Sequence, residues 1–313
     1  MEEITTILGP TACGKTAFAA ALALETGAEI VSADSRQVYR GMTIGTGKDL
    51  DDYTVGGRKI PYHLIDIVDA GCKYNVYEYQ RDFHTVYAKL RASGTPVILC
   101  GGTGLYIEAV LRGYHLSTVP QNAALRASLE GKSLDELATM LQSLKAQSGS
   151  AMHNSTDIDT TQRAIRAIEI ETYNIEHRSE TRRYPPVPSI TLGLYLERET
   201  RRQRISERLE ARLSNGLIEE VEALLHSGLK ASDLMYYGLE YKHVTEHVIG
   251  LTSRKEMYTA LETAIHQFAK RQMTWFRGME RRGTKIHWID AALPLSEKIK
   301  QAKEIINEHK HDR

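Results

Sequence analysis

GPTACGKT, residues 9–16, directly follows the apolar segment Ile4 to Leu8 and precedes the Ala-rich segment Ala17 to Leu24. It matches the phosphate-binding loop pattern, G-x-x-x-x-G-K-[ST], at every fixed position. In this pattern a buried strand ends at the first glycine and a helix begins near the lysine, so successive backbone N–H groups and the helix dipole favour a bound anion. The sequence therefore predicts a site for phosphate or diphosphate.

The residue types in this loop suit such an anion. Gly9 and Gly14 can adopt backbone angles that a Cβ would forbid, while Lys15 supplies an ammonium. The Thr16 hydroxyl can hold Mg²⁺. Cys13 is interpreted as a small packing residue rather than a reactive thiol. We expect this phosphate or diphosphate to be bound by Gly9, Thr11, Ala12, Cys13, Gly14, Lys15 and Thr16.

The composition is that of an ordinary globular protein. The 313 residues are 42% apolar, and 40 Lys and Arg balance 40 Asp and Glu. Three widely spaced cysteines exclude a disulfide framework and a zinc site of the C-x-x-C type. The segment Ala17 to Leu24 is too short to span a bilayer, and the opening residues lack the features of a secretion signal. We expect a cytoplasmic protein without a membrane anchor.

Five apolar, β-rich segments alternate with helical patterns and predict an α/β fold. A phosphate loop after the first strand is typical of a parallel sheet covered by helices on both faces, with ligands at the carboxyl ends of the strands. The predicted strands are Ile4 to Leu8, Glu29 to Ala33, Pro96 to Cys100, Ile190 to Leu196 and Lys285 to Ile289.

The strand pattern stops between residues 114 and 188, where amphipathic helical patterns replace it. Ser133 to Glu136 form a capping-box pattern, and apolar residues from Ile158 to Ile170 indicate a further helix. We therefore predict a helical insertion domain at residues 114–188 within a core domain made of residues 1–113 and 189–313.

The loops after the second and third predicted strands should meet the phosphate loop in one crevice. They contain DSRQ at residues 34–37 and GGTG at residues 101–104. Asp34 is the candidate general base, because a carboxylate there would face the phosphate loop. Asp before Ser-Arg-Gln is equally suited to capping a helix, and the sequence leaves both roles open.

Two basic tracts are candidates for contact with phosphate. Six arginines between Arg198 and Arg212 cannot all face the core of one helix, and five basic residues lie between Lys270 and Arg282. The second tract could equally be a solvated helix face.

Six ordered signatures resemble those of the bacterial tRNA dimethylallyltransferase family. The resemblance extends from residue 4 to about residue 280, and six signatures in order are far more specific than the phosphate loop alone. Lys48-Asp49 stands where the family commonly has Lys-Pro. The signatures are GPTACGKT at 9–16, DSRQVYRGM at 34–42 with IGT at 44–46, YHLID at 62–66, GGTGLY at 101–106, QR at 162–163 with RA at 166–167, and FAKRQ at 268–272 with WFR at 275–277.

The resemblance implies transfer of a dimethylallyl group from dimethylallyl diphosphate to N6 of the adenosine 3′ of the anticodon in tRNA, with Mg²⁺ as cofactor. Asp34, Lys15 and Thr16 would be catalytic, Thr16 would bind the metal, and the chain is expected to act as a monomer. The insertion would grip the anticodon stem-loop. The residues that the resemblance implies in tRNA binding are Asp34, Ser35, Arg36, Gln37, Thr103, Arg126, Gln162, Arg163, Ala164, Ile165 and Arg166.

Two other functions are compatible with a phosphate loop. A small-molecule kinase would share the loop and the sheet, but it would bind ATP and has no need of the long insertion. A nucleotide-gated RNA-binding module without transfer chemistry would bind tRNA independently of Asp34.

Overall fold

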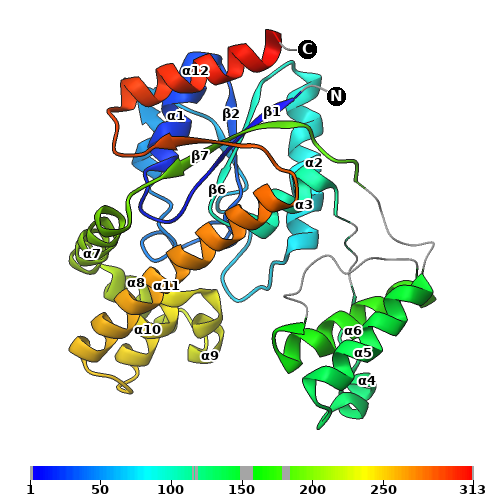
Figure 1. The fold of residues 1–313 in the computed structure, drawn as a ribbon. Coiled ribbons are helices and arrows are strands. Elements are labelled where there is room, and N and C mark those ends of the chain that lie inside the picture. The colour runs from blue at the N-terminus through cyan, green and yellow to red at the C-terminus, as the bar shows by residue number, and fades with distance from the viewer. Residues whose placement is uncertain (1–2, 115, 117–118, 149–157, 178–183, 312–313) are drawn as a thin grey trace. The chain divides into compact units, whose positions relative to one another are not determined.

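The computed structural model describes residues 3–114, 116, 119–148, 158–177 and 184–311. The chain divides into two compact units, one formed by Met1–Gly113 and Pro186–Arg313 and the other by Tyr114–Pro185. We call them the sheet unit and the helical unit (Figure 1).

The sheet unit is built on a six-stranded sheet of order β5-β2-β6-β1-β7-β8, in which every pairing is parallel. This confirms the predicted α/β fold. The short edge strand β5 was not predicted, because two residues form no apolar run. The strands are β1 (Ile4–Leu8), β2 (Glu29–Ser32), β5 (Tyr62–His63), β6 (Val97–Gly101), β7 (Ser189–Tyr195) and β8 (Ile286–Asp290).

Alternating side chains along the strands enter two apolar cores, one on each face of the sheet. Ile7 and Ile98 pack in a core with residues of α1 and α12, whereas their neighbours Leu8 and Leu99 pack in a core with residues of α2 and α3. Both faces are therefore covered, as expected for a parallel sheet. These four helices are α1 (Lys15–Thr26), α2 (Val76–Ala92), α3 (Gly104–Arg112) and α12 (Leu295–His311).

A further group of helices follows β7 and precedes β8 in the chain. Its apolar residues belong to the core on the face of the sheet covered by α2 and α3. Its members are α7 (Arg198–Ser214), α8 (Leu217–His226), α9 (Ala231–Leu234), η3 (Met235–Tyr237), α10 (Leu239–Val248) and α11 (Arg254–Arg281). The segment before β5 holds the 3-10 helix η1 (Leu50–Tyr53) and the antiparallel hairpin of β3 (Thr54–Val55) and β4 (Arg58–Lys59).

The helical unit contains α4 (Ala123–Leu129), α5 (Leu134–Ser148) and α6 (Thr161–Glu176). Leu137, Leu141 and Ile168 belong to its own apolar core. The capping box before α5 is present: Ser133 N donates to Glu136 Oε2 at 2.8 Å, and Glu136 N donates to Ser133 Oγ at 3.3 Å.

The helical unit ends at Pro185, earlier than the predicted boundary at residue 188. The reason is local packing, because Val187 is buried in the core of the sheet unit and Ile4 N donates to Pro188 O at 3.0 Å. Within the described ranges no helix is long and apolar enough to cross a membrane.

Candidate functional site

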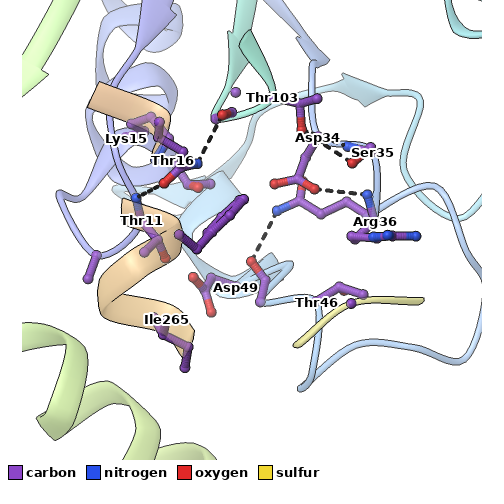
Figure 2. Close-up of a pocket in the computed structure, with 18 of the residues that line it drawn as sticks. Thr11, Lys15, Thr16, Asp34, Ser35, Arg36, Thr46, Asp49, Thr103 and Ile265 are labelled. Atoms are coloured by element: carbon purple, nitrogen blue, oxygen red, sulfur yellow. Dashed lines mark hydrogen bonds between the residues drawn. The ribbon is translucent and has the colours of Figure 1, made fainter. Parts of the chain in front are cut away.

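A cavity of about 960 Å³ lies in the sheet unit at the carboxyl ends of β1, β2 and β6. The loops after all three strands line it, with Thr11, Asp34 and Thr103 as members (Figure 2). Because the three strands are adjacent and parallel, their carboxyl ends share one edge of the sheet. The predicted convergence of the loops is confirmed.

The phosphate loop is held in an unusual backbone conformation by two residues. Gly14 has φ 78° and Ala12 has φ 62°, both in the left-handed region. Gly9, which was expected to need such an angle, does not have one. Its lack of a side chain is required for packing instead, since a Cβ there would lie 2.7 Å from Leu194 O.

Lys15 and Thr16 open α1 and line the cavity, as Figure 2 shows. Lys15 Nζ donates to Pro10 O at 2.7 Å and to Cys13 Sγ at 3.8 Å, which holds the ammonium over the loop. Cys13 itself is fully buried, so its side chain packs and only its backbone could serve an anion. This agrees with its interpretation as a packing residue.

Asp34 follows β2, and its carboxylate lies in the cavity with one oxygen engaged in a turn. Oδ1 accepts from Arg36 N at 2.9 Å, and the residues that follow form turns rather than a helix. Asp34 therefore caps an Asx turn and not a helix. Beside it, Ser35 N donates to Thr103 Oγ1 at 3.1 Å and joins the second loop to the third.

Gln37 was predicted to contact tRNA, but its side chain is buried and committed. Its Nε2 donates to Gly47 O at 3.1 Å, and its Oε1 accepts from Ser32 Oγ at 3.0 Å. The amide thus fixes the cavity wall at Gly47, and the contact of Gln37 with tRNA stays a prediction. Arg36 is more accessible and lies over the Tyr236 ring, 5.4 Å from its centroid.

Gln272 of α11 connects the phosphate loop to the loop after β6. Its Oε1 accepts from Thr11 N at 2.8 Å, and its Nε2 donates to Gly102 O at 2.9 Å. Sequence analysis assigned this residue only to a signature. Its role depends on a contact between residues 261 positions apart, for which no local pattern gives a signal.

The carboxylate of Glu108 on α3 organises the adjoining wall of the cavity. It is fully buried, accepts from Trp275 Nε1 at 3.0 Å, and accepts two bonds of 2.7 Å from Arg282. Arg282, which was expected to be part of a phosphate-binding tract, is therefore an internal ion-pair partner. Arg271 of the same tract does line the cavity.

Three of the six arginines of α7 line the cavity: Arg204, Arg208 and Arg212. Their spacing of four residues places them on one face of the helix, which is the signal that could have singled them out. Arg208 Nη1 lies 3.5 Å from Thr11 Oγ1, and Arg208 Nη2 forms an ion pair with Asp49. Arg212 pairs with Glu240 at 3.2 Å, and burial lowers the pKa of Arg212.

Residues 43–49 form a loop along the cavity wall that is anchored by Glu220 of α8. The Glu220 carboxylate accepts from three successive backbone N–H groups, those of Thr43, Ile44 and Gly45, at 2.8, 2.8 and 3.0 Å. Tyr241 Oη donates to the same carboxylate at 2.6 Å. The first half of this loop is therefore tied to the helices that follow β7.

In the helical unit, Arg126 and Arg166 share one carboxylate, that of Glu169. Arg126 donates two bonds of 2.8 Å to it, Arg166 donates one of 2.9 Å, and Asn122 N donates another of 2.8 Å. These hydrogen bonds, that of Arg126 first, lower the pKa of Glu169 to about 2. Glu169 is thus ionised and oriented by four donors.

The remaining predicted tRNA contacts on α6 differ in accessibility. Gln162 and Arg163 are exposed, and Arg163 forms a 3.4 Å pair with Asp159. Ala164 is fully buried and Ile165 packs against the same apolar core, so neither presents a polar group to a ligand. Both point inward on a helix whose outward positions carry the charges, and their part in tRNA binding stays a prediction.

Comparison with known proteins was made for sequence and for fold. A model of a family described as IPP transferase matches residues 37–279. The chain belongs to this family. It is 61% identical to tRNA dimethylallyltransferase 1 of Porphyromonas gingivalis over 93% of this chain and 95% of that protein. It is 58% identical to tRNA dimethylallyltransferase 2 of Bacteroides fragilis over 98% of both chains.

A crystal structure of the full-length tRNA isopentenylpyrophosphate transferase of Bacillus halodurans has a similar fold. The TM-score is 0.69 at 28% sequence identity, and the match covers 100% of this chain and 99% of that one. Together these similarities confirm the family resemblance predicted from the six signatures, and they make the chain a transferase enzyme.

Proposed function

We propose that the cavity transfers a dimethylallyl group from dimethylallyl diphosphate to N6 of the adenosine 3′ of the anticodon in tRNA and releases diphosphate. One observation carries this proposal: in a chain of the IPP transferase family, the Asp34 carboxylate lies in the same cavity as Lys15 and Thr16 of a phosphate loop. A base for the nucleophile and a site for the leaving group are thereby available together.

The leaving group belongs at the phosphate loop. When the allylic C–O bond breaks, its electron pair stays with the diphosphate, whose negative charge increases. Lys15 Nζ and the backbone N–H groups at the start of α1 face this charge and stabilise it more in the transition state than in the ground state.

The nucleophile is the exocyclic amine of adenine. As the new N6–C bond forms, N6 must lose a proton, and the Asp34 carboxylate accepts it. The turn bond from Arg36 N orients one oxygen of Asp34 and leaves the other to act as base. An adenine in a stacked loop cannot reach a recessed cavity, so the base has to leave the stack to react.

Mg²⁺ suits the donor set of this cavity. Across the described part of the chain no group of three or more His, Cys, Asp or Glu side chains could hold a metal ion alone, while the Thr16 hydroxyl and the Asp34 carboxylate both line the cavity. Such a sparse set fits an ion that takes most ligands from phosphate oxygens and water. Bound there through Thr16, Mg²⁺ would neutralise charge on the diphosphate.

tRNA is the proposed macromolecular substrate. Ser35, Arg36 and Thr103 present polar groups at the cavity, and Arg126, Arg163 and Arg166 give the helical unit cations for the phosphates of an anticodon stem-loop. We propose that the chain acts as a monomer. With the family established, no observation favours the kinase or the non-catalytic binding module.

The test is direct. The full-length protein would be incubated with Mg²⁺, dimethylallyl diphosphate and an anticodon stem-loop that carries the adenosine, and the RNA would be analysed by mass spectrometry. The matched control is the same stem-loop with guanosine in place of that adenosine. We expect one dimethylallyl group on the adenosine stem-loop and none on the control.

Transfer to both RNAs would overturn the assignment of the acceptor, because the control RNA has no N6 at that position. No transfer, together with ATP-dependent phosphorylation of a small molecule, would return the chain to the kinase interpretation. The molar mass of the active enzyme, measured by light scattering, would show whether it is a monomer.

A further inference from the structure

Arg208 connects two parts of the cavity that are distant in sequence. One of its guanidinium nitrogens, Nη1, lies 3.5 Å from Thr11 Oγ1 of the phosphate loop, while Nη2 forms an ion pair with the Asp49 carboxylate. The same guanidinium lies against Gly47, where a Cβ would come within 2.6 Å of Nη2. A cation at the phosphate loop is therefore already paired with an anion that belongs to the chain.

This ion pair is accessible to solvent. The Arg208 and Asp49 side chains are 30% and 40% exposed, whereas those of the neighbouring pair, Arg212 and Glu240, are 13% and 20% exposed. Exposed pairs contribute little free energy, and an arginine binds phosphate strongly because its planar fork matches phosphate oxygens. Arg208 can thus exchange its partner, while Arg212 is held.

Asp49 is placed for this exchange by its backbone. Its φ of 45° lies in the left-handed region, where asparagine and aspartate are tolerated better than most residues and which proline cannot adopt. The loop does not depend on the pair with Arg208, because Glu220 binds its first half and Lys48 Nζ donates to Tyr39 O at 2.6 Å. Asp49 can therefore release Arg208 without loss of the loop.

We propose that Asp49 is an internal counter-ion that competes with the substrate diphosphate for Arg208 and so sets the affinity of the cavity for diphosphate. This inference rests on the proposed function, in which the phosphate loop binds a diphosphate. Binding transfers Arg208 from the Asp49 carboxylate to the diphosphate. After the reaction, the diphosphate product stays bound only as long as it competes with Asp49 for Arg208. Asp49 thereby favours product release.

The experiment measures binding of inorganic pyrophosphate with Mg²⁺ to the full-length protein by calorimetry. Asp49→Asn removes the charge and keeps the size and the tolerance of a left-handed backbone. We expect it to bind pyrophosphate about two- to fivefold more tightly than the wild type, the range that an exposed ion pair can supply. Asp51→Asn is the matched control, because Asp51 is an exposed acid two residues away that does not line the cavity, and its affinity should equal that of the wild type.

A double-mutant cycle identifies Arg208 as the mediator. In the Arg208→Gln background, Asp49→Asn should leave pyrophosphate affinity unchanged, because the contested cation is absent. Unchanged pyrophosphate binding by Asp49→Asn alone would overturn the inference, because Asp49 would then not compete with the ligand. Weaker binding would overturn it too, because Asp49 would then support Arg208. Circular dichroism would confirm that the variant is folded.

Lys15→Ala separates this inference from the proposed function. If wild type binds pyrophosphate and Lys15→Ala does not, the diphosphate site stands whatever Asp49 does. If the wild type and Lys15→Ala both fail to bind, the site assigned to the phosphate loop is wrong, and the role of Asp49 is wrong with it.

Discussion

In the sheet unit, Arg208 is paired with the half-exposed carboxylate of Asp49, whereas in the helical unit Arg126 and Arg166 share the fully buried carboxylate of Glu169. The first arrangement joins single side chains on the wall of a cavity and can be exchanged for a ligand. The second fixes two cations by four donors on one anion and leaves each arginine 38% exposed. The same residue type thus serves exchange in one unit and fixed presentation in the other.

Backbone strain follows the same division. Among the described residues, the non-glycine residues with positive φ are Ala12, Asp49, Leu64 and Asp66, and all belong to the sheet unit. Ala12 and Asp49 line the cavity. Strained backbone persists where surrounding structure fixes it, and it gathers at functional sites. The helical unit, by contrast, relies on capped helices and a buried ion cluster.

The largest effect should come from the chemistry of the cavity. Asp34→Asn keeps an oxygen for the bond from Arg36 N but cannot accept a proton, so turnover should fall about 10²- to 10⁴-fold. Affinity for the stem-loop should stay close to that of wild type. Single-turnover kinetics and filter binding would measure the two quantities. If Asp34→Asn were active, Asp34 would only stabilise the turn and would not be the general base.

The next effect concerns pH and the helical unit. Because the pKa of Glu169 is lowered to about 2, its ion cluster stabilises the folded state fully above the unfolded pKa of about 4.5. That stability, up to about 3 kcal/mol, should be lost as the pH falls from about 4.5 through about 2. Hydrogen exchange of peptides from α4 and α6 would follow it. Glu169→Gln is the reference, and an equal loss of protection in both proteins would show that Glu169 is not responsible.

Substituting the arginines of the helical unit should have a smaller effect, and this effect should be on RNA binding. Arg166→Ala removes one fixed cation, which should weaken stem-loop binding by about 1 kcal/mol and reduce the salt slope by about one. Arg163→Ala removes an exposed cation held only by Asp159 and should change affinity less. Titrations at several salt concentrations would compare them. A larger loss for Arg163→Ala would contradict the advantage assigned to a fixed orientation.

The smallest effect is expected from the strained loop. Ala12→Gly removes the strain of a left-handed alanine, which stabilises the folded state by about 1 kcal/mol. Glycine also raises the conformational entropy of the unfolded chain, which destabilises the protein by a similar free energy. Stability should therefore change by less than about 0.5 kcal/mol, as measured by urea denaturation. A clear stabilisation would mean that the strain at Ala12 is larger than this balance allows.

The sequence predicts the frame of the sheet unit well because long apolar runs mark buried strands. The predicted run Ile4 to Leu8 coincides with β1, and the run Glu29 to Ala33 extends one residue beyond β2. Convergence of the three loops follows from parallel topology alone. Two-residue strands such as β5 leave no such pattern and were missed.

The candidate site is only partly predictable, because several of its residues act through distant contacts. Gln272 bridges two loops from a helix near the end of the chain, and Asp49 depends on a backbone angle that sequence does not specify. Ala164 shows the opposite limit: the predicted tRNA-binding stretch 162–166 spans a helical turn and so includes its inward face, where Ala164 is buried. Such long-range contacts and the burial of single residues can be assigned only from the structure.

Gln272 also bears on how the enzyme is made. The N–H of Thr11 and the carbonyl of Gly102 lie in segments synthesised early, yet their common partner comes 261 residues after Thr11. A nascent chain therefore carries the complete phosphate-loop sequence long before it can close the loop. We therefore expect the two loops to remain unbridged by this side chain until α11 has been synthesised.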